Sequence, residues 1–384
     1  MARIQESERD VAPSAKGTDA ELEKLRERID AVDAALLDSL NERARLVEAV
    51  GRLKRDTGTV VYEPGRERRI VEGLSQRNTG PFPDAGLDPV FREIISATRS
   101  LEEPVQVAYF GPEGTFTHQA ARHQFGEQST LASVPSITEV FAAVEGGKVA
   151  LGVVPVENTT EGIVTEAYDA LAQFDVTICA EIVLRISHDL LSSTGRLEDI
   201  EEVASHAQPL AQCRRWLDTR LPDVERVQAT STATAAQQAA QDPKGHKAAI
   251  GSHIAAEAYG LQVVESGIED RRDNSTRFLV LGQTPPSPSG RDLTSVVFTI
   301  RKDQAGGLFR LIQPFAKEGV NLTTIQLRPI HGKPWEYLFF IDLEGHQQDA
   351  AVRAALEGAS TVAHSSRVLG SFPRAEFERG LGGR

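Results

Sequence analysis

The chain has 384 residues, with 42 basic and 55 acidic side chains and a formal net charge of −13. This length is typical of about two or three domains, and an apolar content of 40% with 25% charged residues argues against a disordered chain. The acidic balance argues against a nucleic-acid or anionic-membrane partner, because both bind dense basic surfaces.

Compartment and cofactors are predicted from features that the sequence lacks. No apolar run approaches the roughly 20 residues that span a bilayer, and the charged N-terminus lacks the apolar segment of a secretory signal. Two cysteines, Cys179 and Cys213, are too few for a disulfide framework or a metal cluster. We therefore expect a cytoplasmic protein without a metal or another cofactor.

The N-terminal part predicts an all-α domain. Residues 1–17 are polar without periodicity, which predicts a disordered tail. Thr18 and Glu21 fit a capping box, and apolar residues then recur at helical spacing to about Asp56. Such a helix would be about 60 Å long, and its apolar stripe needs a partner helix, most simply from a second copy of the chain. Two further helices are expected at 67–76 and 90–101, separated by a loop at 78–89.

Cations on the long helix are expected to converge. Arg43 and Lys54 lie 11 residues apart, so about 20° separates them around the helix axis and they share a face. Arg26 lies about 100° away around the axis and can serve the pocket of a paired helix. Arg66 can complete an anion site, since guanidinium groups bind carboxylates bidentately. The alternative is a solvated helix face, which surface helices commonly carry.

Residues 22–101 resemble the all-helical chorismate mutase family. The matching segments are LRERIDAVD at 25–33, NERARLVEAVGRLK at 41–54, GRER at 65–68 and FREIISA at 91–97. The resemblance implies that this part holds the dianion chorismate in a reactive conformer and stabilises charge on the breaking ether bond. Arg26 of the second copy, Arg43 and Arg66 would bind carboxylates, Lys54 would face the ether oxygen, and Glu67 would hold the substrate hydroxyl.

Three further positions are implied in the same pocket. Glu63 stands where the family commonly has Asp, Thr98 where it commonly has Ser, and Glu102 where members have Gln or Glu. A glutamate at position 102 must be protonated to donate to the ether oxygen, so mutase activity should fall as pH rises. The alternative for Glu102 is a solvated residue of the segment before Pro104.

From Val105 the pattern changes to strands that alternate with helices. Strands are expected at 105–109, 150–156, 176–186, 202–205 and 248–250, and helices at 162–173, at 208–220 and before Tyr259. This alternation predicts an α/β fold with mainly parallel sheets. The pattern restarts near residue 190, which predicts two lobes with a cleft.

Small polar residues follow several of these strands, where α/β folds bind ligands. They occur in GPEGTFT at 111–117, PVENT at 155–159, SHAQ at 205–208, TSTAT at 230–234 and NSTRF at 274–278. Each motif alone is weak, because hydroxyls after strands commonly cap helices. Together, and with IED at 268–270, they resemble prephenate dehydratase over residues 105–281. The resemblance implies a two-lobed fold like that of periplasmic binding proteins.

The resemblance also implies that this unit removes carbon dioxide and the ring hydroxyl from prephenate. Thr276 would hydrogen-bond the departing hydroxyl as a positioned donor, because threonine is far too weak an acid to titrate at neutral pH. Arg277 would bind a carboxylate or orient its loop. His206 is an alternative acid, but a lone histidine is more often structural, and Cys213 is expected to be a small buried residue. The other implied pocket residues are Asn158, Thr159, Ser205, Gln212, Thr230, Ser231, Thr232 and Phe278, the last expected to pack rather than react.

The segment 283–291, which contains QTPPSPSG, is the clearest linker in the chain. After it, strands are expected at 295–301, 321–330, 336–343 and 366–370, and helices at 307–318 and 349–358. This βαββαβ order predicts an α+β ferredoxin-like fold. Residues 294–372 resemble the ACT domain, through AGGLF at 305–309 and LRPIHGKPWEY at 327–337.

In dehydratases the ACT domain senses phenylalanine, which the resemblance implies here. A glycine-rich turn that enters a helix leaves N–H groups open for a carboxylate. Gln326 and Leu327 stand where the family typically has Glu and Ser, and Gly307 stands where alanine is usual. The alternative is a dimerisation module without a ligand. The implied ligand residues are Ala305, Gly306, Gly307, Leu308, Gln326, Arg328 and Pro329.

The three resemblances follow the order of the bifunctional chorismate mutase–prephenate dehydratase family, also called P-proteins. The expected domains are a mutase at 18–103, a dehydratase at 105–282, and an ACT domain at 292–375. They imply a homodimer or a dimer of dimers that makes phenylpyruvate from chorismate, with phenylalanine as effector. Two alternatives stay open: a dehydratase that prefers arogenate, and a non-catalytic α/β ligand sensor fused to a mutase.

Overall fold

The structure is a computed structural model that describes residues 15–57, 63–99, 101, 105–300, 305–330, 332 and 336–375. Its contacts divide the chain into two compact units, the first long helix and the remainder. Residues 1–14 of the predicted tail lie outside the described residues, whereas residues 15–17 belong to the first helix. None of the described helices combines the length and apolarity that a bilayer crossing requires.

Helix α1 (Ala15–Thr57) is the first unit and has 43 residues, or about 64 Å of length. It begins before Thr18, so the predicted capping box is wrong. Ala15 and Lys16 favour a helix, and Gly17 costs only about 1 kcal/mol, so the helix extends through all three. Six residues of the predicted apolar stripe are exposed along α1, Leu22, Leu25, Ile29, Val32, Leu36 and Leu40, as are the apolar residues Leu37, Leu46 and Leu53.

Two helices open the second unit, α2 (Pro64–Arg77) and α3 (Leu87–Arg99), with a 3₁₀ helix, η1 (Asp84–Gly86), between them. Both helices begin earlier than predicted. Pro64 opens α2 and Pro89 lies in the first turn of α3, where proline is tolerated because the first N–H groups of a helix have no intrahelical partner.

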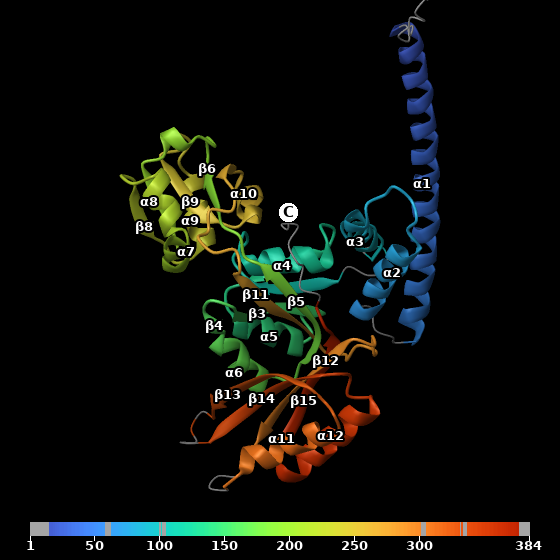
Figure 1. Ribbon diagram of the computed structural model, residues 1–384, viewed down its shortest axis with the longest axis vertical. Helices are drawn as coiled ribbons and strands as arrows, with labels where there is room; N and C mark the ends of the chain where they lie inside the picture. Colours follow the sequence, from blue (N-terminus) through green and yellow to red (C-terminus); the bar gives the residue numbers. More distant parts are fainter. Residues whose placement is uncertain are drawn as a thin grey trace, which may run out of the picture. The chain divides into compact units, whose positions relative to one another are not determined.

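The first lobe of the α/β part is a sheet in the order β2-β1-β3-β11-β5, with the short β4 beside β3 (Figure 1). Two of its helices are capped at their N-termini by the hydroxyls of Thr115 and Ser136, which accept hydrogen bonds from backbone N–H groups. Its strands are β1 (Gln106–Phe110), β2 (Thr130–Val134), β3 (Leu151–Asn158), β4 (Gly162–Ile163), β5 (Thr177–Arg185) and β11 (Ser275–Gly282). Its helices are α4 (Phe116–Phe125), α5 (Ile137–Glu145) and α6 (Thr165–Gln173).

The second lobe is a separate sheet in the order β10-β6-β9-β7-β8, and Figure 1 draws it apart from the first sheet. The predicted restart near residue 190 is confirmed, because β6 begins at Asp189. Its strands are β6 (Asp189–Ser192), β7 (Glu202–Ser205), β8 (Glu225–Gln228), β9 (Lys247–Gly251) and β10 (Gln262–Glu265). Its helices are η2 (Leu197–Asp199), α7 (Ala207–Gln212), α8 (Arg214–Arg220), α9 (Thr232–Ala240) and α10 (His253–Tyr259).

Three features of this α/β part differ from the sequence predictions. Both sheets are mixed, because β11 returns from the second lobe and enters the first sheet antiparallel to β3 and β5, and β6 runs antiparallel to β9 and β10. The predicted helix 162–173 begins only at Thr165, because Gly162 has a positive φ of 82°. The predicted helix 208–220 is two helices that meet at Cys213.

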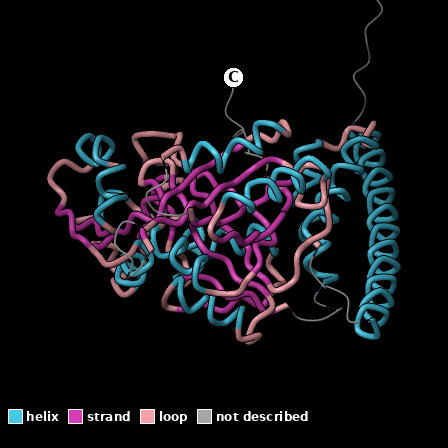
Figure 2. Tube along the Cα trace, turned by 90° about the horizontal axis from the view of Figure 1, so that it is seen from below, coloured by secondary structure: helices cyan, strands magenta, loops and turns pink. Residues whose placement is uncertain are grey.

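The C-terminal sheet has the order β13-β14-β12-β15, as expected of a ferredoxin-like fold. One face packs Phe298 and Ile341 against α11 and α12, whereas the other face packs Phe340 and Phe372 into the core of the first lobe. Figure 2 shows the strands of the protein with helices around them. The elements are β12 (Asp292–Thr299), α11 (Gly307–Lys317), β13 (Leu322–Pro329), β14 (Tyr337–Glu344), α12 (Ala350–Val362) and β15 (Ser365–Pro373). The predicted linker at 283–291 therefore connects the α/β part to the C-terminal sheet, and these two parts share one hydrophobic core.

Strand β15 lies against β5 at this shared core, and Gly370 permits the approach. A Cβ atom on Gly370 would overlap the backbone of Ile178. We expect Gly370→Ala to lower the free energy of unfolding by about 1–3 kcal/mol, since the backbone must move apart. Gly73→Ala in α2 is the control, because nothing lies within 4 Å of its added Cβ atom. Equal denaturant midpoints for the two variants would contradict the explanation that the close approach of Ile178 requires glycine at position 370.

Candidate functional site

The centre of the candidate dehydratase site is a pair of residues on neighbouring strands. Thr276 on β11 lies opposite Asn158 on β3 in the antiparallel register. Asn158 Nδ2 donates to Thr276 Oγ1 at 2.8 Å and to Asn274 Oδ1 at 2.9 Å. Thr276 is buried, with 8% of its surface exposed. The structure thus brings together two of the sequence-predicted residues.

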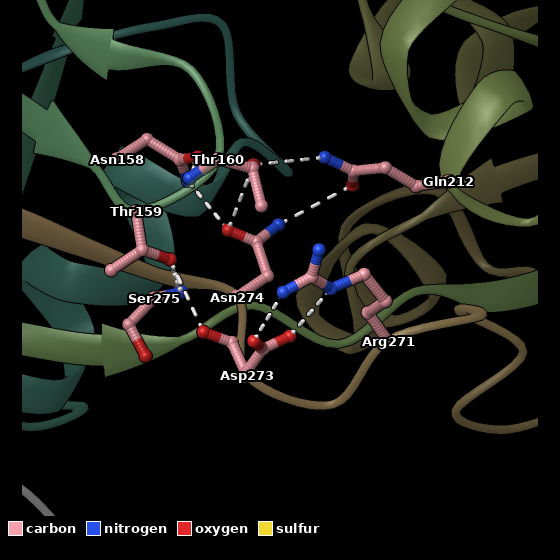
Figure 3. Close-up of polar contacts among 8 residues, drawn as sticks. All are labelled: Asn158, Thr159, Thr160, Gln212, Arg271, Asp273, Asn274 and Ser275. Carbon is pink, nitrogen blue, oxygen red and sulfur yellow. Dashed lines mark hydrogen bonds and ion pairs between the residues drawn. The ribbon is translucent and has the colours of Figure 1, made fainter.

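Gln212, at the end of α7, reaches this cluster from the second lobe. Its Nε2 lies 3.3 Å from Thr160 Oγ1, and its Oε1 accepts from Asn274 Nδ2 at 3.3 Å. These contacts are drawn in Figure 3. A third contact joins Gln212 Oε1 to His188 Nε2 at 2.8 Å. Gln212 therefore bridges the two lobes, as its predicted place in the pocket requires.

Thr159 holds the start of β11 in place. Its Oγ1 accepts from the backbone N–H of Ser275 at 2.9 Å and donates to the carbonyl of Asp273 at 3.2 Å (Figure 3). The neighbouring Asp273 also forms an exposed ion pair with Arg271 at 2.6 Å. Thr159 therefore orients the loop that carries Asn274.

The two crossovers between the lobes meet beside this cluster. Ile186 donates its N–H to the carbonyl of Asn274, and Ile268 donates to the carbonyl of His188, both at 2.9 Å. The carboxylate of Glu269 is buried there and accepts from the N–H of His188 at 2.9 Å and from Ser187 Oγ at 3.2 Å. Sequence reasoning used Glu269 only as part of a motif, and the structure shows that it holds the crossovers together.

Sequence reasoning missed three members of the cluster: Thr160, Asn274 and His188. Thr160 follows the motif PVENT and Asn274 is the first residue of NSTRF, so proximity to Asn158 and Thr276 was an available signal. No sequence signal pointed to His188, because a histidine between a hydroxyl residue and a strand does not by itself indicate a functional site. Only the meeting of the crossovers places it beside Gln212.

Four predicted pocket residues have structural partners within the second lobe. Ser205 Oγ is buried and donates to the carbonyl of Ile250 at 2.7 Å, which ties β7 to β9. Ser231 is the N-cap of α9 and accepts from the N–H of Thr234 at 3.0 Å, and Thr230 donates to Thr234 Oγ1 at 3.2 Å. Thr232 is the first residue of α9. Among the described hydrogen bonds, none joins these residues to the Thr276 cluster.

Arg277 lies on the side of the sheet opposite the cluster, where its guanidinium is paired with carboxylates of the protein. Successive strand residues face opposite sides of a sheet, so Arg277 lies on the side opposite Thr276. Its guanidinium pairs with Glu181 and with Asp342 of the ACT sheet, each at 2.6 Å. Phe278 is buried in the core of the first lobe, as expected of a packing residue.

The surroundings of His206 and Cys213 give no indication of a catalytic role. His206 is exposed at the N-cap position of α7 and its side chain makes no capping bond. Cys213 is fully buried, as predicted, and burial raises the pKa of its thiol. In the part of the chain that the structure describes, no group of three or more His, Cys, Asp or Glu residues could hold a metal ion.

Burial lowers the pKa of His188 and of His118, because a charged imidazole is disfavoured away from water. Below about pH 6.5 the unfolded chain then binds protons that the folded chain does not, so the folded state loses stability as pH falls. We expect the thermal midpoint to drop between pH 7 and pH 5, measured by circular dichroism. The His188→Gln variant should show a smaller drop of the thermal midpoint over this pH range. If the drop is as large as in the wild type, His188 is not its cause.

The predicted mutase residues lie on both units. On α1, Arg26 forms an exposed ion pair with Glu23 at 3.3 Å, and Arg43 lies further along the same helix. The side chain of Lys54 and the whole of Glu102 lie outside the described residues. Glu63 occupies the N-cap position of α2, and Arg66 is exposed in its first turn.

Two mutase residues have internal partners that the sequence did not predict. Glu67, expected to hold the substrate hydroxyl, pairs with Arg99 of α3 at 2.8 Å. Thr98 is buried and donates to the carbonyl of Ile94 at 2.7 Å. The Glu67–Arg99 pair joins α2 to α3, whereas the hydrogen bond of Thr98 lies within α3, and substrate would have to replace these contacts.

The predicted regulatory residues surround the start of α11 and the end of β13. Ala305 and Gly306 precede α11, and Gly306 has a positive φ of 73°. Gly307 begins the helix and Leu308 is 40% exposed. Gln326 and Pro329 lie on β13, whereas Arg328 on the same strand binds Asp169 of α6 through two nitrogens at 2.9 and 3.1 Å. In the described structure the Arg328 guanidinium is thus held by Asp169.

Three family models match the chain. They are chorismate mutase type II over residues 25–103, prephenate dehydratase over 107–286, and the ACT domain over 294–360. Their order is the order of the three folds described above.

Whole-length relatives and solved structures agree with these matches. The bifunctional chorismate mutase/prephenate dehydratase of Aquifex aeolicus is 42% identical over 359 residues, which is 92% of this chain and 98% of that protein. The protein of the same name from Pseudomonas aeruginosa is 42% identical over 361 residues, with the same two coverages. The solved prephenate dehydratase of Arthrobacter aurescens, described in complex with L-Phe, is 33% identical, with a TM-score of 0.65 and coverage of 70% of this chain and 90% of that chain.

Proposed function

The chain belongs to the family of bifunctional chorismate mutase/prephenate dehydratases, and from this premise we propose which residues carry out each of its two reactions. It rearranges chorismate to prephenate and then converts prephenate to phenylpyruvate with loss of carbon dioxide and the ring hydroxyl. Both substrates are dianions, so each site needs a few placed cations or donors rather than a basic surface.

For the mutase we propose a pocket completed by a second copy of the chain. The exposed apolar stripe of α1 supports pairing, since isolated apolar surface of this extent favours burial. Arg26 of the second copy, Arg43 and Arg66 would bind the carboxylates. Lys54 and Glu102 would face the ether oxygen. Residues nearer the substrate hydroxyl would be Glu63, Glu67 and Thr98.

A protonated Glu102 predicts a characteristic pH profile for the mutase. Only the protonated carboxyl can donate to the ether oxygen, so we expect mutase kcat to fall as pH rises from 5 to 9. Glu102→Gln, which donates at every pH, should remove the dependence. A wild-type rate that stays flat across this range would exclude Glu102 from the role.

For the dehydratase we propose Thr276 as the donor to the departing hydroxyl. The contact between Asn158 and Thr276 carries this proposal, because it holds a buried hydroxyl at the point where both lobes meet. Asn158, Thr159 and Gln212 would shape the pocket around it. Ser205, Thr230, Ser231 and Thr232 would line the second lobe. Arg277 and Phe278 would support the strand from its other side.

We propose that phenylalanine binds the ACT domain and inhibits the enzyme. The glycine-rich turn at 305–307 leaves backbone N–H groups at the start of α11, which suit a carboxylate. The relative from Arthrobacter aurescens, solved with L-Phe, supports this choice of effector. Leu308 and Gln326 would contribute to the site, whereas Arg328 would act through Asp169. We further propose a cytoplasmic homodimer or dimer of dimers.

One experiment tests the whole assignment: chorismate is supplied to the purified enzyme with and without millimolar phenylalanine, and prephenate and phenylpyruvate are followed. We expect phenylpyruvate to accumulate and phenylalanine to slow its formation. Prephenate that is supplied directly and stays unconverted would favour a non-catalytic sensor. Faster turnover of arogenate than of prephenate would favour the arogenate alternative. An enzyme that neither binds phenylalanine nor responds to it would have a purely dimerising ACT domain.

A further inference from the structure

Asn158 can take only one orientation, which determines what Thr276 can do. The Oδ1 atom of Asn158 accepts from the backbone N–H groups of Thr160 at 2.9 Å and Glu161 at 3.1 Å. Backbone N–H groups only donate, so the oxygen of this amide must face them and Nδ2 must face Thr276. Thr276 Oγ1 therefore accepts at 2.8 Å, and its own hydrogen is left for another partner.

The hydrogen bonds on the other side of Asn158 run in the same donor-to-acceptor direction. Thr160 Oγ1 donates to Asn158 Oδ1 at 2.6 Å, and Gln212 Nε2 donates to Thr160 Oγ1 at 3.3 Å. At the far end, Gln212 Oε1 lies 2.8 Å from His188 Nε2. An amide oxygen only accepts, so His188 Nε2 carries a hydrogen. These contacts form one chain of donors, from His188 through Gln212, Thr160 and Asn158 to Thr276.

His188 is held in the form that this chain requires. The ring is 2% exposed and packs edge-on against Phe116 at 5.5 Å between centroids. Its Nδ1 is buried without a hydrogen-bond partner among the described groups. A bare ring nitrogen tolerates this position better than an N–H that lacks an acceptor. Burial therefore favours the neutral ring with its hydrogen on Nε2.

We propose that His188 is a positioning residue of the dehydratase, whose Nε2–H makes the shorter of two contacts to Gln212 Oε1 and, together with Asn274 Nδ2, fixes the Gln212 amide as a donor to Thr160, which keeps the hydrogen-bond chain directed toward Thr276. This inference rests on the proposed role of Thr276 as donor to the departing hydroxyl. A reversed Gln212 amide would turn its oxygen toward Thr160, which would then donate to Gln212 rather than to Asn158. Because His188 lies in a crossover and Gln212 in the second lobe, the same bond holds Gln212 across the two lobes.

The first test is a set of variants that separates donation from packing. His188→Leu removes the donor, and we expect dehydratase kcat to fall about 10- to 100-fold, the effect of about 1–3 kcal/mol. His188→Gln keeps an N–H near the position of Nε2 and should recover most of the rate. His246→Leu, at an exposed histidine paired with Glu201, is the matched control and should leave the rate unchanged. Mutase activity of each sample reports whether the protein is folded.

A double substitution tests whether His188 acts through Gln212. In a Gln212→Leu background the chain is already broken, so adding His188→Leu should lower kcat no further. A full additional loss in that background would overturn the proposal, as would a His188→Gln variant as slow as His188→Leu.

The third test does not depend on turnover. Nitrogen-15 NMR of histidine-labelled enzyme, with the His188 signal identified by its loss in His188→Gln, should show a protonated Nε2 and a bare Nδ1. The opposite tautomer would overturn the proposal even if the variants were slow. An enzyme with the expected tautomer that makes no phenylpyruvate would instead contradict the proposed function.

Discussion

Thr276→Ala is expected to lower the dehydratase rate by about 10²- to 10⁴-fold, the range for loss of a positioned proton donor in the transition state. The hydroxyl of Thr276 is buried and accepts from Asn158, so its hydrogen is the group available to the departing hydroxyl. Both hydrogens of the neighbouring Asn158 amide are already used, because its Nδ2 donates to Thr276 and to Asn274. The measurement is phenylpyruvate formation from prephenate.

Two comparisons make this result interpretable. Thr276→Ser keeps the hydroxyl and should retain most of the rate. Chorismate mutase activity of Thr276→Ala should equal that of the wild type, because the proposed mutase residues belong to the N-terminal helical part and not to β11. Normal dehydratase rates in the alanine variant would remove Thr276 from the mechanism.

Arg277→Met is expected to lower the free energy of unfolding by about 3–5 kcal/mol, because it leaves two buried carboxylates without a cation. The side chains of Arg277, Glu181 and Asp342 are 14%, 7% and 11% exposed. Ser295 also donates to Asp342, so the network extends into the ACT sheet. Because Arg277 follows Thr276 in β11, we also expect the variant to respond less to phenylalanine. Chemical denaturation and inhibition curves measure the two effects.

The matched control is Arg196→Met, which breaks an exposed pair with Glu198 whose partners are 63% and 64% exposed. Exposed pairs contribute about 0–1 kcal/mol, so this variant should be nearly unchanged. Adding Glu181→Gln and Asp342→Asn to Arg277→Met should recover much of the lost stability, since the uncompensated charges are removed. If Arg277→Met is no less stable than Arg196→Met, the buried network does not hold the two domains together.

Local patterns and the motifs they contain predicted the three folds in their order. Helical periodicity described α1 to within a few residues of its ends, and the βαββαβ order was visible because each strand and helix is bounded by turns. The motifs around Asn158 and Thr276 were recognisable because they are contiguous in the chain. These are short-range properties, which residue spacing records directly.

Tertiary structure decided the partners of the charged residues and the direction of the returning strand. Arg277 and Arg328 both looked like ligand residues, yet they pair with Asp342 and Asp169 across the boundary between the dehydratase and ACT domains. The sheets are mixed because β11 returns through the second crossover, and His188 meets Gln212 only where the crossovers join. Such contacts join residues far apart in the chain, and neither spacing nor composition records them. Sequence alone therefore determined which domains the protein has and in what order, whereas packing between distant segments determined that Arg277 and Arg328 pair across the domain boundary.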